Sequence, residues 1–195
     1  MSEVTHAPHD LSADSGDRSG RTLRPLLVRI GAVLAAFVVA GVAAGALWER
    51  LWDAPAGLTY QGQWYLEPAG PDFSFEAIAL FVLIAFPLGL VLAVLCGIRR
   101  GHEVATVVTV LLAAGVAAFV MYAVGTALGP GDPQALAAGK ADYTPLDGGL
   151  GLTAPDPGRV PWHSSALVAF PAGAMTGLVG TYLLGSRGFV RRPRG

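Results

Sequence analysis

The sequence predicts an all-α membrane protein with four transmembrane helices in two antiparallel hairpins and a small β-hairpin and loop cap on the outer side. Three observations lead to this prediction. Hydrophobic residues make up 53% of the 195-residue chain and charged residues only 14%, whereas soluble domains have about 25% charged residues. The apolar residues gather in four long runs, and most basic residues lie on one side of those runs.

The four apolar runs set the predicted helix boundaries. Crossing about 30 Å of hydrocarbon takes about 20 apolar residues. The runs cover residues 30–48, 77–98, 104–128 and 165–185, and none of them contains Asp, Glu, Lys or Arg. Backbone groups in lipid must bond internally, which favours helix. The first run is too long for a signal peptide, whose apolar region has about 7–15 residues, so we expect it to remain as an anchor. The predicted spans are 26–48, 76–98, 104–128 and 164–185, within a transmembrane domain over 24–186.

The distribution of basic residues predicts the orientation. Ten of the 13 Lys and Arg residues lie before the first run, between the second and third, or after the fourth. The positive-inside rule then places both termini in the cytoplasm and the loops 49–75 and 129–163 outside. The chain has no Asn, and Arg far outnumbers Lys, which is typical of a GC-rich bacterial genome. We therefore expect a multi-pass protein of the bacterial inner membrane.

Both outer loops have a composition that predicts structure. Residues 58–66 are strand formers around Gly62 and predict a β-hairpin. Residues 146–153 are expected to add one extended piece, because a lone hairpin is marginal in water. Together the loops are predicted to form a cap with an acidic surface, which is the best candidate for a partner site. Its expected apolar contacts are Trp52, Trp64, Trp162, Leu146, Leu150 and Leu152.

All four tryptophans lie on the predicted outer side. Tryptophan is enriched where the membrane meets water, so we expect interfacial anchors rather than ligand-stacking groups. The predicted anchors are Trp48, Trp52, Trp64 and Trp162.

The cytoplasmic parts are short. Residues 1–23 have no apolar period and are expected to be disordered. Residues 187–195 form a basic tail. The loop between the second and third spans has only a few residues, so these spans should be antiparallel neighbours.

An internal repeat is visible in the apolar runs. A shift of 84 residues lays the second run on the fourth, with Phe86-Pro87 on Phe170-Pro171. True repetition predicts a pseudo-twofold axis along the membrane normal; coincidence in an Ala- and Gly-rich chain is the alternative. Pro87 and Pro171 each remove a helix hydrogen bond and are expected to kink their helices.

Small residues recur every four positions in these runs and predict close helix packing. The residues predicted to lie in helix contacts are Gly41, Gly45, Gly89, Ala93, Gly173 and Gly177.

No motif for chemistry is present. The single cysteine excludes an intrachain disulfide, and His102-Glu103 has no second histidine on its helix face. His6 and His9 lie in the polar tail with no helix to present them. We therefore predict no catalytic residue, no cofactor, no metal ion and no nucleic-acid partner.

The order of several features resembles a family of small actinobacterial four-helix integral membrane proteins of unknown function. The matching elements are Gly41 to Trp48 leading to Pro55, Arg99-Arg100-Gly101 in the inner loop, Val124-Gly125 to Gly129-Pro130, and Phe170-Pro171-Ala172. The resemblance covers roughly residues 26–186 and implies a topology and a lineage without catalytic residues.

These observations favour a non-enzymatic accessory or assembly partner in the bacterial cell envelope. The expected partners are the lipid bilayer and other membrane or envelope proteins. The sequence does not indicate which oligomeric state the protein has. A small transport or channel subunit acting as an oligomer is the alternative, and a membrane-embedded enzyme is third. Polar residues converging at the bilayer midplane would favour transport, whereas an apolar bundle under an aromatic, acidic cap would favour partner binding.

Overall fold

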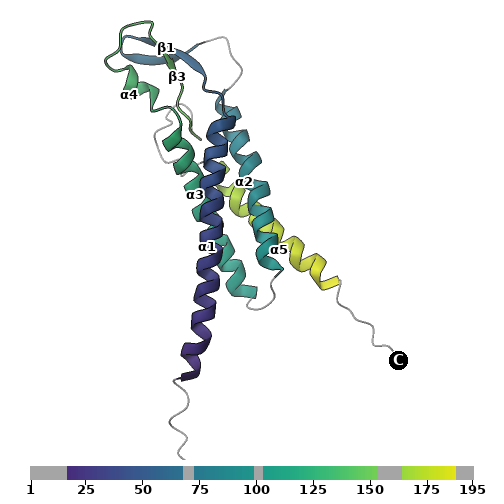
Figure 1. The fold of residues 1–195 in the computed structure, drawn as a ribbon. Coiled ribbons are helices and arrows are strands. Elements are labelled where there is room, and N and C mark those ends of the chain that lie inside the picture. Colours follow the sequence, from purple (N-terminus) through teal and green to yellow (C-terminus); the bar gives the residue numbers. More distant parts are fainter. Residues whose placement is uncertain (1–16, 68–72, 99–102, 153–163, 188–195) are drawn as a thin grey trace, which may run out of the picture.

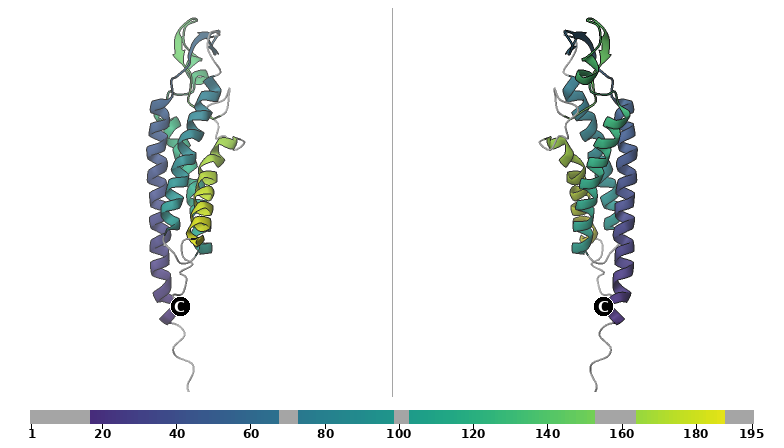
Figure 2. Two further views of the ribbon diagram at one scale, coloured as in Figure 1. Left: turned by 90° about the vertical axis from the view of Figure 1, so that its right-hand side faces the viewer. Right: turned by 90° about the vertical axis from the view of Figure 1, so that its left-hand side faces the viewer.

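The computed structural model describes residues 17–67, 73–98, 103–152 and 164–187. Four long helices lie side by side in an elongated bundle, with a small sheet at one end (Figure 1). The start of α1 and the end of α5 lie at the opposite end (Figure 2). The elements are α1 (Asp17–Leu51), β1 (Ala56–Tyr60), β2 (Gln63–Leu66), α2 (Phe73–Gly97), α3 (Glu103–Leu128), α4 (Pro133–Ala137), β3 (Pro145–Asp147), the 3-10 helix η1 (Ser165–Val168) and α5 (Ala169–Arg187).

The prediction of four long apolar helices is confirmed. α1, α2, α3 and η1 with α5 are each long and apolar enough to cross a membrane. α1 starts at Asp17, so residues 17–23, which were expected to be disordered, belong to this helix. The rest of that segment, residues 1–16, lies outside the described residues. Large apolar side chains cover the outside of the bundle, as a lipid-facing surface requires; examples are Leu83, Leu95, Leu112, Val179 and Leu183.

The helices pack in two main pairs, α1 with α3 and α2 with α5. The helices of each pair run in the same direction. α2 and α3 are consecutive and antiparallel, but they share only a small contact. The short link between them therefore sets their directions without making them the main packing partners.

The glycines predicted for helix packing lie in these two pairs. A Cβ built on Gly41 would lie 2.7 Å from the carbonyl oxygen of Ala117. Gly45 lies in the same way against Met121 of α3. Such spacing excludes any side chain and lets the helix backbones approach closely.

In the other pair the glycines alternate between the two helices. Gly89 of α2 lies against the carbonyl of Phe170, and Gly173 of α5 lies against the carbonyl of Phe86. Gly177 meets Leu90 in the next turn. Ala93 is fully buried within α2.

The two prolines differ from each other. α2 continues through Pro87 as one helix. Pro171 is the third residue of α5, where the missing N–H would have no α-helical partner. The helix type changes just before Pro171, since η1 ends at Val168 and α5 begins at Ala169. The kinks expected at the two prolines stay predictions.

Two of the four tryptophans that were predicted to be interfacial anchors are buried in the structure. Trp48 has no exposed surface and Trp52 is 7% exposed, so both lie in the core rather than at a lipid-facing rim. The Trp48 Nε1 donates to the carbonyl oxygen of Ala77 at 2.9 Å, and its ring meets Phe81 edge-on at 5.1 Å. Trp64 belongs to the sheet, and Trp162 lies outside the described residues.

The three-stranded sheet has the order β2-β1-β3, with both pairings antiparallel. The predicted hairpin is confirmed. Its turn residues, Gln61 and Gly62, have φ values of 50° and 72°, as a type I′ turn requires. The predicted third piece, 146–153, is confirmed only at residues 146 and 147, which belong to β3. The described residues that follow are not in a strand, and Leu150 and Leu152 are buried against the core.

α4 was not predicted, because the loop that contains it is rich in Gly and Pro. The residues that specify this helix nevertheless lie next to it in the sequence. Asp132 caps the helix by accepting from the backbone N–H of Gln134 at 3.0 Å, and Pro133 follows at the first helical position.

Candidate functional site

An open groove lies on one face of the sheet. The sheet is at the end of the molecule remote from the start of α1 and the end of α5 (Figure 1). The volume of the groove is about 360 Å³, within the range of about 300–1,000 Å³ typical of ligand sites. We call it the tyrosine groove. It is lined by Leu58, Thr59, Tyr60, Tyr65, Leu66, Glu67 and Tyr143.

The strand register explains how the tyrosines meet. Leu58 pairs with Tyr65 across β1 and β2, and Tyr60 is two residues further along β1, so all three point to the same face. The Tyr60 ring centroid lies 6.5 Å from that of Tyr65 and 5.8 Å from that of Tyr143. The three side chains are 42%, 50% and 70% exposed in the order Tyr60, Tyr65 and Tyr143. The sheet therefore displays a contiguous aromatic surface instead of burying it.

Tyr143 has a strained backbone. Its φ is 64°, which is uncommon for a residue with a bulky side chain. The Tyr143 N–H donates to the carbonyl oxygen of Thr59 at 2.6 Å. Such strain persists only where the surroundings enforce it, and it clusters at ligand-binding positions.

Thr59 enforces this conformation from a fully buried position. Its hydroxyl donates to the carbonyl oxygen of Ala141 at 2.6 Å and accepts from the Thr144 N–H at 3.0 Å. Asp142 adds a bond from the hairpin turn, accepting from the Gln61 N–H at 2.7 Å. Residues 141–144 are thus tied to β1 on both sides of Tyr143, which fixes the backbone that carries this ring.

The other side of the sheet is closed. The Trp64 indole covers Gly57, where any Cβ would overlap the ring, and its Nε1 donates to the carbonyl oxygen of Leu146 at 3.0 Å. Gln134 of α4 bonds both backbone groups of Trp64, at 3.2 Å and 3.0 Å. This side chain covers the edge of β2, which blocks strand addition there.

Charged residues around the sheet are mainly acidic. Between 49 and 67 and between 129 and 152 the described residues hold six acids and two bases. The acids are Glu49, Asp53, Glu67, Asp132, Asp142 and Asp147, and the bases are Arg50 and Lys140. The described residues of the sheet end therefore carry a formal charge of −4 at neutral pH. One of these acids, Glu67, is among the residues that line the groove.

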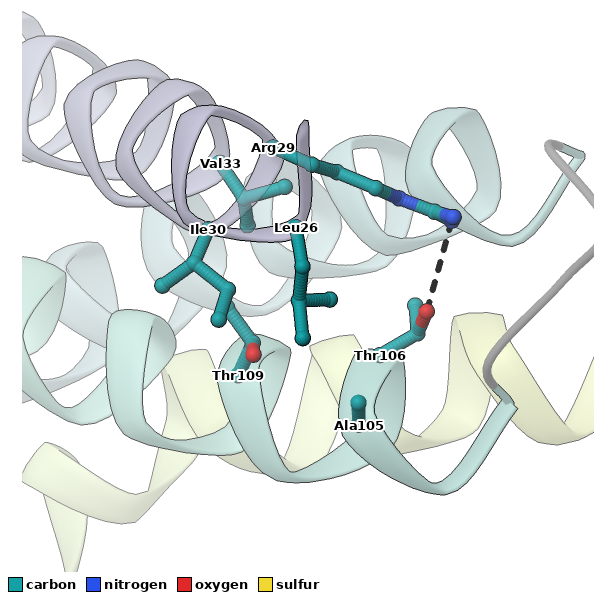
Figure 3. Close-up of a pocket in the computed structure, with 7 residues that line it drawn as sticks. All are labelled: Leu26, Arg29, Ile30, Val33, Ala105, Thr106 and Thr109. Atoms are coloured by element: carbon teal, nitrogen blue, oxygen red, sulfur yellow. Dashed lines mark hydrogen bonds between the residues drawn. The ribbon is translucent and has the colours of Figure 1, made fainter. Parts of the chain in front are cut away.

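A second, much smaller groove lies between α1 and α3 at the other end of the bundle. Figure 3 shows Arg29 reaching from α1 to the Thr106 hydroxyl, which accepts at 3.3 Å. Its free volume of about 10 Å³ is room for about one water. The groove is otherwise lined by Leu26, Ile30, Val33, Ala105 and Thr109. This is a polar tie between helices and is too small for an organic ligand.

The interior of the bundle is apolar over the described residues. Among the buried side chains of the helices, only Thr106 and Tyr122 carry oxygen. Threonine hydroxyls elsewhere are bonded within their own helices: Thr126 to Tyr122, Thr176 to Ala172 and Thr181 to Gly177. No group of three His, Cys, Asp or Glu side chains lies together in the described part of the chain.

The tyrosine groove is not among the features that the sequence predicts. The sequence predicts an aromatic, acidic cap, and the strand alternation could have placed Tyr60 and Tyr65 on one face. Tyr143 follows the first strand by more than 80 residues, and no local pattern marks it. Comparisons of the chain with protein-family models, curated proteins and solved structures find no match.

Proposed function

We propose that this chain is a four-span protein of the bacterial inner membrane that acts as a non-enzymatic accessory or assembly partner, with its sheet end outside and both termini in the cytoplasm. The observation that carries the proposal is the open tyrosine groove. It lies on a sheet that hydrogen bonds tie to residues 141–144, above an apolar bundle. A rigid aromatic surface is typical of a binding site, because tyrosine supplies contact area at low entropic cost.

The distribution of charged residues supports the proposed membrane arrangement. Arg24 and Arg29 lie at the end remote from the sheet, while the acidic residues gather at the sheet. In this orientation α1 and α2 form one antiparallel hairpin and α3 and α5 the other. From the sequence resemblance we also propose that the chain is related to the small actinobacterial four-helix integral membrane proteins.

Cysteine labelling tests this orientation. In a Cys96→Ala background, Lys140→Cys should react with a membrane-impermeant maleimide in intact spheroplasts. Arg24→Cys should react only after permeabilisation. The reverse order of labelling would contradict the proposed topology.

Affinity purification in mild detergent tests the partner role. Envelope proteins that copurify with the native chain should be lost when Tyr60, Tyr65 and Tyr143 are all replaced by Ser. A Leu183→Ala variant, altered on the lipid-facing surface, serves as the control and should retain them. An identical set of copurifying proteins from the triple variant would contradict docking at the groove.

A small transport or channel subunit is the second candidate. Gly115 is exposed and a Cβ there would meet nothing within 4 Å, so a helix of another copy could approach closely. Because the interior of one chain is apolar, the path would have to form between copies. Ion flux in vesicles that disappears with Gly115→Leu would favour this candidate.

A further inference from the structure

We infer that the tyrosine groove binds the guanidinium group of an arginine-bearing segment of a partner protein on the outer side of the membrane. This inference rests on the proposed function and names the chemistry of its partner. It is carried by three exposed tyrosine rings, a carboxylate beside them, and the net negative charge of the sheet end.

The aromatic rings supply the first part of the argument. The faces of aromatic rings are negative and attract cations within about 6 Å of the centroid. Tyr60 is the central ring, with Tyr65 and Tyr143 at 6.5 Å and 5.8 Å. Their planes are inclined by 62° and 52°, so the ring surfaces face different directions around the groove. A planar cation can then lie on the negative face of one of these rings, since ring edges are positive and do not attract it.

Charge supplies the second part. Glu67 lines the groove, and its backbone N–H is held by the carbonyl oxygen of Ala56 at 3.2 Å. The surrounding acids raise the local concentration of a cationic segment. A neutral or anionic peptide gains nothing from either feature, so the groove selects for positive charge.

The choice of arginine follows from the shape of the group. The guanidinium is planar, stacks on aromatic rings and is weakly hydrated, whereas the ammonium of lysine is compact and strongly hydrated. Its N–H donors can also bond the Glu67 carboxylate in the plane of the group while its face lies on tyrosine. The groove is open, and Leu58 and Leu66 are among the residues that line it. These apolar side chains suit the arginine stem.

Pre-organisation supplies the third part. Tyr143 is held at φ 64° by residues tied to Thr59, and its ring is 70% exposed. Holding a large aromatic ring in water in a strained conformation costs free energy without adding to the core. A ring on a backbone that is already fixed loses less freedom when a ligand arrives, which lowers the entropic cost of binding.

The experiment is a titration of the full chain in detergent with acetyl-Gly-Arg-Gly-Arg-Gly-amide, followed by calorimetry and by the NMR signals of ring-labelled tyrosine. The matched probe has citrulline in place of arginine, which keeps the shape and removes the charge. We expect the arginine peptide to shift the tyrosine signals and to bind at least tenfold more tightly than the citrulline peptide. Equal binding of the two peptides would overturn the inference.

Variants separate the groove from general charge. Tyr143→Asn keeps a residue that tolerates positive φ but removes the ring, and should weaken arginine binding about fivefold; Tyr143→Phe should bind as the native chain does. Glu67→Gln should weaken binding severalfold, whereas Asp147→Asn, which removes the same charge outside the groove, should change it less than twofold. Unchanged binding by Tyr143→Asn, or equal losses for the two carboxylate variants, would contradict a groove site.

The two proposals fail in different ways. If the triple serine variant loses its envelope partner while arginine and citrulline peptides bind alike, the arginine inference is wrong and the docking role stands. If the copurifying proteins are unchanged in that variant, the docking role is wrong, whatever the peptides do.

Discussion

The two main helix pairs differ in symmetry. In the α2 and α5 pair, Gly89 meets Phe170 and Gly173 meets Phe86. These partners are 81 and 87 residues apart, on either side of the 84-residue shift that relates the two helices in sequence. The contact is therefore reciprocal, as in an isologous interface, which supports true repetition over coincidence for this pair.

The α1 and α3 pair has lost this register. Gly41 and Gly45 each meet the residue 76 positions later, and Gly125 lies against Trp48 at an offset of 77. Relative to the 84-residue repeat, α3 is displaced along α1 by about two turns, or roughly 12 Å. Trp48 has no large counterpart under the repeat, because the equivalent residue is Asp132, which lies beyond the end of α3. The α1 and α3 pair, with this buried ring against Gly125, therefore lacks the reciprocal contacts that small residues make in the other pair.

Removing that ring should have the largest effect. Trp48→Ala removes the contact with Gly125, the edge-on contact with Phe81 and the bond to Ala77. Truncation of a buried aromatic costs about 3–5 kcal/mol, and we expect a loss of that size in the free energy of unfolding in detergent. Trp48→Phe should lose less, because a ring remains. A loss below 1 kcal/mol for the alanine variant would contradict the central role of Trp48.

The α2 and α5 pair should lose similar stability when a large side chain is introduced on either helix. Gly89→Leu and Gly173→Leu each force a side chain into a backbone carbonyl of the facing helix, and overpacking costs about 1–3 kcal/mol. We expect similar losses of unfolding free energy for the two variants in SDS titrations. Gly115→Leu is the control, since a Cβ there meets nothing within 4 Å. Losses that differ by more than 2 kcal/mol would argue against reciprocity.

The same contrast shows what the sequence could predict. Helix spans and the hairpin around Gly62 depend on local patterns, and both are confirmed. The position of Trp48 was wrong because enrichment of tryptophan near membrane surfaces does not say whether a ring faces lipid or the bundle. Its burial depends on Gly125 and Ala77, which lie on two other helices.

The tyrosine groove was beyond prediction for a related reason. The strand pattern indicates Tyr60 and Tyr65, but the position of Tyr143 depends on a buried hydroxyl of Thr59 that bonds residues more than 80 positions away. Positive φ at a tyrosine also runs against residue preference. Short-range preferences therefore predict the elements, and long-range hydrogen bonds decide which side chains the sheet displays.

The polar tie at the other end of the α1 and α3 pair should contribute less than Trp48. Thr106→Val removes the acceptor for Arg29 while keeping the shape of the side chain. A net hydrogen bond contributes about 1 kcal/mol, so we expect a decrease of that order in the free energy of unfolding. Thr109→Val, in the same groove, is the matched control and should have a smaller effect. An equal effect of both changes would assign the loss to the groove in general and not to the bond.

The sharpest test of the repeat is a double exchange of equivalent residues, which should have the smallest net effect on stability. Gly97 and Thr181 are equivalent under the 84-residue shift and face each other, with a Cβ on Gly97 falling 3.1 Å from the Thr181 Cγ2. Gly97→Thr alone should cost about 1–3 kcal/mol by overpacking. In a reciprocal contact, adding Thr181→Gly exchanges the two residues across the axis and should restore unfolding free energy to within about 1 kcal/mol of the native chain.

The displaced pair provides the control for this exchange. Gly41→Ala with Ala117→Gly also conserves composition, but the new Cβ still meets the Ala117 backbone oxygen, 2.7 Å away. That double variant should recover nothing relative to Gly41→Ala, because removing the side chain of residue 117 leaves its carbonyl in place. Recovery in both exchanges, or in neither, would remove the distinction between the helix pairs, since only a register centred on the repeat makes the two sides of a contact interchangeable.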